Sequence, residues 1–342
     1  MKQITLGTTG ITVPQNAFGA LPIQRVDFET AKAILLRARE GGIRFFDTAR
    51  AYSDSEEKLG YAFSELRDKI YIATKTTAKT PKDFKEQLET SLKLLKTDYI
   101  DIYQFHMAET CWRPGDGTGM YECMLEAKEQ GKIRHIGVTA HKLGVAEECI
   151  ESGLYETLQF PLSYLSSEKD LKLVRMCQEK NMGFIAMKGL AGGLISNSRA
   201  AFSYMSQFDH VLPIWGIQRM TELDEWLSYM DNPPAMDDDI RRFIEAEKEE
   251  LTGDFCRGCG YCLPCPAGIP INNCARMSLM VRRAPSAAWL NETWQENMKK
   301  IENCLECGQC SSRCPYELDT PNLLKKNYED YKNILAGKTS IS

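Results

Sequence analysis

The chain has 342 residues, of which 43% are hydrophobic and 26% are charged, and its formal net charge is −5. This length exceeds the size at which a single hydrophobic core usually stops growing, so we expect one large domain and one smaller domain. The small negative charge gives no reason to expect nucleic acid or an anionic membrane surface as a partner.

Neither a secretory signal nor a membrane span is expected. The segment Met1–Ala20 lacks the charged and then apolar pattern of a signal peptide. No run of about 18 apolar residues occurs, so we expect no membrane-spanning segment. Disulfides belong to oxidising compartments, whereas thiolates spaced as metal ligands need a reducing one, so we expect a cytoplasmic location.

Residues 1 to 235 alternate β-rich and amphipathic helical segments, which is the pattern of a parallel sheet with crossover helices. The predicted strands are Asn16–Ala20, Gly42–Phe46, Lys69–Thr74, Tyr99–His106, Ile133–Thr139, Thr157–Phe160, Gly183–Ala186 and Leu212–Trp215. The predicted helices are Phe28–Glu40, Ser55–Leu66, Pro81–Leu95, Met120–Gln130, Leu143–Ser152, Glu168–Lys180, Arg199–Phe208 and Thr221–Met230. Eight strands alternating with eight helices predict an α/β fold, the (β/α)8 TIM barrel.

Two further observations bear on this fold. The segment Lys2–Val13 has the polar, glycine-containing pattern of a small hairpin, which we expect to plug the bottom of the barrel. An open doubly wound sheet is the alternative fold, but its glycine-rich dinucleotide turn, G-x-G-x-x-G after the first strand, is missing.

Polar side chains follow three of the predicted strands, where catalytic groups of such barrels gather. Asp47 follows Gly42-Ile-Arg-Phe-Phe46, Lys75 follows Ile70-Tyr-Ile-Ala-Thr74 and His106 follows Asp101-Ile-Tyr-Gln-Phe105, while Tyr52 comes five residues after Asp47. Taken singly, each has a structural reading as a helix cap, a surface charge, a core histidine or a packed aromatic ring. Together, in this order and with these flanking residues, they resemble the catalytic tetrad of the aldo-keto reductases. The resemblance to this family extends over residues 1 to 235.

The resemblance implies a role for each member of this tetrad. Hydride delivery to a carbonyl carbon places negative charge on the oxygen, so a proton donor must be within reach. Tyr52 is the implied donor, and because a free phenol has a pKa of about 10, Lys75 is expected to lower that pKa while Asp47 keeps the lysine charged and oriented. His106 is expected to hydrogen-bond the carbonyl oxygen.

The resemblance also implies a nicotinamide cofactor and a small-molecule carbonyl or alcohol substrate. Thr139 and Gln159 stand where the family contacts the nicotinamide carboxamide, and Met187 stands where many members stack an aromatic ring. Arg219 is in position to meet a phosphate, and Glu225 matches an adenine-contacting glutamate. NADP is therefore slightly preferred over NAD as the expected cofactor.

The barrel pattern ends at Asn232-Pro-Pro-Ala235, and an acidic helix, Ile240–Leu251, leads into a cysteine-rich region. We expect a barrel over residues 1–235, a linker helix over 236–253, and a small, mainly α-helical ferredoxin-like domain over 254–342. The helices expected in that last domain are Ile271–Arg283, Ala287–Lys300 and Thr320–Leu335.

Eight of the 13 cysteines form two short runs, each closed by proline. The second run has the C-x2-C-x2-C-x3-C-P spacing of bacterial two-cluster ferredoxins, in which the fourth thiolate ligates the other 4Fe–4S cluster; the first run is one residue shorter before its last cysteine. One cluster is therefore expected on Cys256, Cys259, Cys262 and Cys314, and the other on Cys304, Cys307, Cys310 and Cys265. Zinc is the alternative, because C-x2-C pairs also make structural zinc sites.

The combined pattern predicts an NAD(P)-dependent oxidoreductase fused to a two-cluster domain, which matches a subgroup of the aldo-keto reductases. Nicotinamide moves two electrons and a cluster moves one. The clusters are therefore expected to serve a redox partner protein, to hold the domain together, or to sense redox state. The alternative function is a non-catalytic electron-transfer or redox-sensing protein on a reductase-like barrel.

Overall fold

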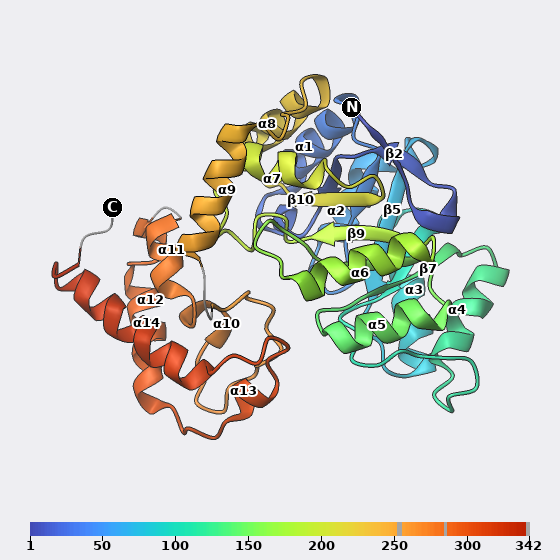
Figure 1. Ribbon diagram of the computed structural model, residues 1–342. Helices are drawn as coiled ribbons and strands as arrows, with labels where there is room; N and C mark the ends of the chain where they lie inside the picture. Colours follow the sequence, from blue (N-terminus) through green and yellow to red (C-terminus); the bar gives the residue numbers. More distant parts are fainter. Residues whose placement is uncertain (252–254, 284–285, 340–342) are drawn as a thin grey trace. The chain divides into compact units, whose positions relative to one another are not determined.

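The computed structural model describes residues 1–251, 255–283 and 286–339 (Figure 1). The chain divides into two compact units. The first comprises Met1–Gly189 and Arg199–Asp237, and the second comprises Leu190–Ser198 and Asp238–Ser342. The boundary expected at residues 253 and 254, between the linker helix and the ferredoxin-like domain, lies outside the described residues.

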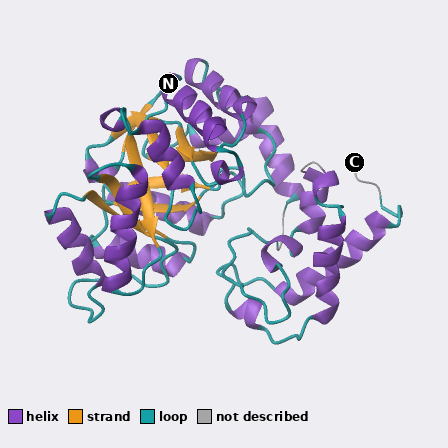
Figure 2. Ribbon diagram, turned by 180° about the vertical axis from the view of Figure 1, so that it is seen from behind, coloured by secondary structure: helices purple, strands orange, loops and turns teal. Residues whose placement is uncertain are grey.

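Eight parallel strands of the first unit close into a barrel in the order β10-β3-β4-β5-β6-β7-β8-β9. They are β3 (Ala17–Gly19), β4 (Phe45–Asp47), β5 (Tyr71–Thr76), β6 (Ile100–Phe105), β7 (Ile133–Thr139), β8 (Thr157–Pro161), β9 (Gly183–Met187) and β10 (Val211–Gly216). Figure 2 shows these strands in orange, enclosed by helices. The predicted TIM barrel is confirmed, and because the sheet is closed, the open doubly wound alternative is wrong.

Helices follow the barrel strands along the chain. They are α1 (Phe28–Glu40), α2 (Ser55–Phe63), α3 (Pro81–Leu95), α4 (Met120–Glu129), α5 (Leu143–Ser152), α6 (Glu168–Glu179), α7 (Ser198–Met205) and α8 (Met220–Asp231), with 3₁₀ turns η2 (Pro22–Arg25) and η3 (Arg67–Lys69). α1 shows why these segments are helical. The Asp27 side chain accepts from the Thr30 N–H at its start, and Ala31, Ile34, Leu35 and Ala38 place one apolar stripe against the core.

The first residues form the expected hairpin. β1 (Gln3–Thr5) pairs antiparallel with β2 (Thr12–Pro14), and η1 (Gly7–Thr9) lies between them. The apolar side chains of the hairpin share one core cluster with inward-facing residues of the strands, among them Ile4, Leu6, Phe45, Ile102 and Leu212. Gly7 lies against Gly183, the first residue of β9, so the hairpin closes the amino-terminal end of the barrel.

The second unit is built from helices and loops in its described residues. They are α9 (Asp238–Glu250), α10 (Ile271–Cys274), α11 (Met277–Arg283), η4 (Ser286–Ala288), α12 (Glu292–Lys299), η5 (Lys300–Asn303), α13 (Gln309–Ser312) and α14 (Thr320–Leu335). The helix expected over Ile271–Arg283 is two helices, because the chain turns at Ala275 and Arg276. Ile271, Met277, Met298 and Leu324 join several of the cysteines in its core.

No helix in the described part of the chain has the length and apolar character needed to cross a membrane.

Candidate functional site

The four tetrad residues come from three neighbouring strands and one connecting loop. Asp47 ends β4, Lys75 lies near the end of β5, and His106 directly follows β6. Tyr52 lies in the loop between β4 and α2. Because the strands are parallel and adjacent, these residues meet at the carboxyl-terminal end of the barrel, as the sequence analysis expected.

Lys75 and Asp47 form a buried ion pair. The Lys75 ammonium donates to both carboxylate oxygens of Asp47, at 2.8 and 2.7 Å, and to the Thr48 carbonyl at 2.5 Å. The two residues are only 1% and 2% exposed. Burial raises the pKa of Asp47, and the Lys75 charge acts in the opposite direction. All three ammonium donors of the lysine are used, so the charge is held in one position.

Tyr52 and His106 lie beside this ion pair. The Lys75 nitrogen is 5.2 Å from the centre of the Tyr52 ring. The Tyr52 and His106 rings meet edge to face, with their centres 5.7 Å apart. The structure therefore brings all four tetrad residues together.

Burial decides the protonation of both rings. It raises the pKa of Tyr52, Lys75 lowers it and Asp47 raises it, so the balance is upward where the sequence analysis expected a lowered value. Burial, with a smaller contribution from Lys75, lowers the pKa of His106 to about 3. At neutral pH the phenol therefore keeps its proton and the imidazole is neutral. Each ring can donate one hydrogen bond.

The loop that carries Tyr52 is fixed at both ends. The Thr48 and Ser55 hydroxyls are 2.8 Å apart, and the Ser55 hydroxyl donates to the Ala20 carbonyl at 2.8 Å. Glu56 is fully buried, where it pairs with Arg50 and accepts from the Thr74 hydroxyl at 2.6 Å. These contacts anchor the loop that carries the phenol.

Gln104 is a buried site residue that the sequence analysis missed. Its amide donates to Gln159 Oε1 at 3.0 Å and to Asp47 Oδ1 at 3.5 Å. The signal was available, because side chains alternate along a strand and Gln104 stands two residues before His106, on the same inward face of β6.

The residues expected to contact nicotinamide lie on β7, β8 and β9. Thr139 and Gln159 are register partners, and the Thr139 hydroxyl accepts from the Met107 N–H at 2.7 Å, which leaves its own proton to donate. Gln159 Nε2 donates to Asp47 Oδ2 at 3.4 Å, so this side chain links the expected carboxamide position to the tetrad. Met187 ends β9 beside Pro161 and is half-buried.

Arg219 and Glu225 are exposed residues of the first unit. Arg219 caps the start of α8, and its guanidinium is paired with Glu222 at 2.7 Å. Glu225 lies within the same helix and is exposed. Both positions follow β10, as expected, but Arg219 already has an acidic partner with which a phosphate would compete.

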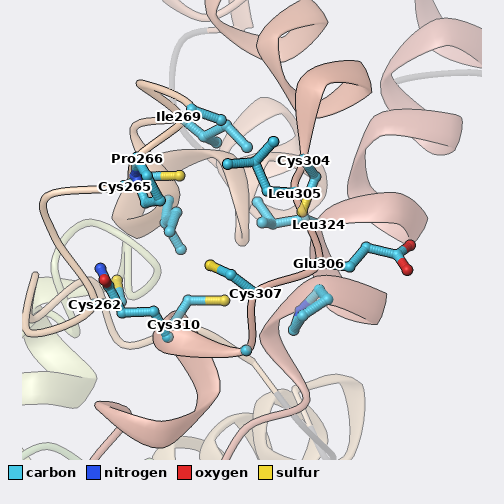
Figure 3. A pocket seen from close by; sticks show the side chains of 15 residues that line it. Cys262, Cys265, Pro266, Ile269, Cys304, Leu305, Glu306, Cys307, Cys310 and Leu324 are labelled. Atoms are coloured by element: carbon cyan, nitrogen blue, oxygen red, sulfur yellow. The ribbon is translucent and has the colours of Figure 1, made fainter.

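The eight cysteines expected as ligands line two hollows in the second unit. The first hollow, of about 340 Å³ including space open to solvent, is lined by Cys256, Cys259, Cys262 and Cys314. The second, of about 370 Å³ counted in the same way, is lined by Cys265, Cys304, Cys307 and Cys310, together with Cys262 (Figure 3). Each hollow thus gathers three cysteines of one run and the proline-preceding cysteine of the other. Those are the two sets that the sequence analysis named.

The thiols that line each hollow are suited to hold a cluster. The eight cysteines are free, and four or more of them line each space. A cubane has its own iron and sulfide atoms between its four ligating thiolates, so a hollow lined by thiols suits it. Four thiolates at about 2.3 Å from one zinc ion are the alternative arrangement.

Comparison with protein families identifies both regions. The model of the aldo/keto reductase family matches residues 3–211, and that of a 4Fe–4S dicluster domain matches residues 255–319. Among curated proteins, D-galacturonate reductase of Fragaria ananassa is 34% identical over 44% of this chain and 55% of its own length. The NADH-specific methylglyoxal reductase of Escherichia coli is 27% identical over 58% of this chain and 70% of its own.

Coverage of the first relatives is incomplete, whereas solved structures match more fully. The chain spans 55% of the D-galacturonate reductase and 64% of the aldo-keto reductase YhdN of Bacillus subtilis, which is 29% identical over 57% of this chain. An aldo-keto reductase of Bacillus halodurans in its holo form has a TM-score of 0.64 at 23% identity, over 72% of this chain and 96% of its own. One of Klebsiella pneumoniae, solved with NADPH, has a TM-score of 0.60 at 20% identity, over 72% and 95%.

The family match covers more than half of the chain, and the structures share its barrel. The chain belongs to the aldo/keto reductase family and carries a 4Fe–4S dicluster domain after its barrel.

Proposed function

We propose that the barrel reduces a small-molecule carbonyl to an alcohol with a nicotinamide cofactor, and catalyses the reverse reaction. The observation that carries this is the buried Lys75 ammonium, held by Asp47 and placed 5.2 Å from the Tyr52 ring. A purely structural ion pair has no need of a phenol and an imidazole beside it.

Tyr52 is the proposed proton donor. Burial keeps its phenol protonated at neutral pH, so the proton is available when negative charge forms on a carbonyl oxygen. As the proton leaves, the Lys75 ammonium stabilises the phenolate, and Asp47 prevents the lysine from moving away. His106, neutral because its pKa is about 3, donates a second hydrogen bond that orients the same oxygen.

The residues present fit a nicotinamide at this end of the barrel. A bound nicotinamide supplies or accepts the hydride. Thr139 and Gln159 each keep a donor for a carboxamide after their internal hydrogen bonds are counted. Met187 offers a half-buried apolar surface at the end of β9. Arg219, once released from Glu222, suits a phosphate, so we propose NADP in preference to NAD.

For the second unit we propose two 4Fe–4S clusters, one ligated by Cys256, Cys259, Cys262 and Cys314 and one by Cys304, Cys307, Cys310 and Cys265. Such clusters pass one electron at a time. Cys307 is exposed, which suits exchange with a redox partner protein at the second hollow. We propose electron transfer as the role of this domain.

The experiment uses the full chain, purified without oxygen, with NADPH or NADH and a panel of aldehydes and ketones. We expect nicotinamide oxidation that depends on the carbonyl, with one alcohol formed per nicotinamide consumed. Bleaching of the cluster absorption by reduced nicotinamide alone would show that the two centres communicate. Absence of carbonyl-dependent oxidation across the panel with both cofactors contradicts the proposed reaction.

A further inference from the structure

Arg276 is a buried cation outside the tetrad. It lies in the turn between α10 and α11 and is only 8% exposed. Its Nε and Nη1 groups have no hydrogen-bond partner among the described residues. Burying a guanidinium is costly unless a negative charge compensates it. Some negative group must therefore act on this side chain.

Two glycines let the backbone approach the guanidinium closely. A Cβ on Gly258 would lie 2.9 Å from the Arg276 Cζ, and a Cβ on Gly192 would lie 2.7 Å from its Nη1. Both glycines have a φ of +67°, a conformation that favours glycine. Gly258 lies between Cys256 and Cys259, so Arg276 packs directly behind the segment that lines the first hollow.

Gly258 links the Arg276 guanidinium to Cys256. Its backbone packs against the guanidinium, and its N–H donates to Cys256 Sγ at 3.3 Å. A buried cation therefore lies behind the same peptide segment that donates a hydrogen bond to this sulfur. A cation and a hydrogen-bond donor both stabilise negative charge on a nearby cluster.

The second hollow is lined by an acidic residue instead of a basic one. Glu306 lines it, with its carboxylate paired to Lys325 at 2.5 Å. The first hollow is lined instead by Arg257, whose guanidinium lies 4.3 Å from the centre of the Tyr316 ring. The two hollows are therefore alike in their thiols and unlike in their charged neighbours.

We propose that Arg276 compensates the charge of the cluster in the first hollow and raises its reduction potential above that of the second cluster. Reduction adds one negative charge to a cluster, and a buried cation favours that charged state, because net charge and hydrogen bonds to sulfur set cluster potentials. This inference rests on the proposed ligation of two clusters. Electrons that enter at the exposed Cys307 would then run toward the first hollow.

The test is a redox titration of the oxygen-free full chain, followed by electron paramagnetic resonance, for wild type, Arg276→Gln and Arg276→Lys. In Arg276→Gln we expect the higher of two potentials to fall by at least 59 mV, the equivalent of a tenfold change in the reduced fraction for a one-electron couple, and the lower to stay unchanged. Arg276→Lys keeps the charge and is expected to retain most of the wild-type value. Arg241→Gln removes an exposed charge from α9 in the same unit and is the matched control.

Iron and sulfide are counted in every sample, which separates this proposal from the ligation on which it rests. About eight irons with unchanged potentials in Arg276→Gln contradicts the role of Arg276 alone, whereas about four or fewer irons in wild type contradicts the ligation. If Arg276→Gln does not retain its clusters, Gly192→Ala, whose Cβ would displace the guanidinium, provides the second test. A shift of the lower potential, or of both equally, in either variant also overturns the proposal.

Discussion

The two candidate sites differ in how the buried charge beside them is balanced. In the barrel, Lys75 is paired with Asp47, and Arg67 donates to Asp101 at 2.6 Å, so the chain itself supplies both signs. In the second unit, Arg276 lies buried against Gly258, beside the first hollow, with two of its donor groups unpaired in the described structure. The comparison indicates that the ion pair of the barrel is balanced by the chain alone, whereas the charge balance beside the first hollow depends on what its cysteines ligate.

The largest expected effect comes from breaking the barrel's ion pair. Lys75→Met leaves the Asp47 carboxylate buried without its partner, and we expect the free energy of unfolding of the barrel to fall by about 3–5 kcal/mol. Carbonyl reduction should be lost as well. Denaturant unfolding followed by circular dichroism measures the first effect.

Lys79→Met is the control for that experiment, because Lys79 is exposed and pairs with the equally exposed Glu109. We expect this change to cost about 1 kcal/mol or less. Equal losses of stability in the two variants would show that the buried pair contributes no more to the stability of the barrel than the exposed pair does.

Removing one proline-preceding cysteine tests the second unit. Cys314→Ser should lower the iron content from about eight to about four atoms per chain, because Cys314 lines the first hollow with the cysteines of the other run. Cys274→Ser is the matched control, since Cys274 is buried in the same unit but lines neither hollow. Unchanged iron in Cys314→Ser argues against the crossed ligation.

The pH dependence tests the protonation of the two rings. His106, with its pKa lowered to about 3, becomes charged only in strong acid, and Tyr52, with its pKa raised above 10.0, ionises only in strong base. We therefore expect kcat/KM for carbonyl reduction to stay level from about pH 5 to 9. A change in kcat/KM near pH 6.5 that disappears in His106→Gln would contradict the claim that the imidazole of His106 is neutral.

The lowered pKa of His106 also predicts how the free energy of unfolding of the barrel depends on pH. The unfolded chain binds a proton at the ordinary histidine pKa of 6.5, whereas folded His106 does so only near 3. Stability is therefore full above about 6.5 and is lost as the pH falls from there toward 3. Burial also lowers the pKa of His141, which adds to the loss. The pH dependence of barrel unfolding should be less steep in His106→Gln than in wild type.

The smallest expected effect concerns the cofactor phosphate. Arg219→Gln should raise the KM for NADPH about fivefold, the equivalent of about 1 kcal/mol for an exposed pair, and leave that for NADH unchanged. Steady-state kinetics with both cofactors measure this. Equal changes in the two KM values would mean that Arg219 does not bind the 2′-phosphate of NADPH.

Much of the barrel was predictable because its signals are local. Strand and helix periods alternate clearly, and β7, α1, α3 and α5 begin and end at the predicted residues. Asp47, Lys75 and His106 followed from strand ends, which the fold brings together, whereas Tyr52, in a loop, followed from the resemblance to the aldo-keto reductases. Gln104 was missed because it lies inside the strand Ile100–Phe105, whereas candidate residues were sought at the strand ends. Only the closed barrel shows that it faces Asp47.

The second unit was less predictable because its order depends on contacts between distant segments. The spacing of the cysteines in the sequence indicated which of them line each hollow. The break at Ala275 and Arg276 does not interrupt the spacing of the apolar residues, so Ile271–Arg283 was expected as one helix. The packing of Gly192 and Gly258 against the guanidinium is a tertiary contact between distant segments, and no local sequence pattern predicts it.

The most direct test of the account is the rate of carbonyl-dependent NADPH oxidation by Tyr52→Phe, measured without oxygen and beside wild type. This change removes one hydroxyl from the ring beside Lys75 and leaves the Asp47 pair intact. We predict a fall of about 10²- to 10⁴-fold in kcat/KM, with unchanged iron content. A variant that retains the wild-type rate would contradict Tyr52 as the proton donor, and with it the proposed reaction at this site.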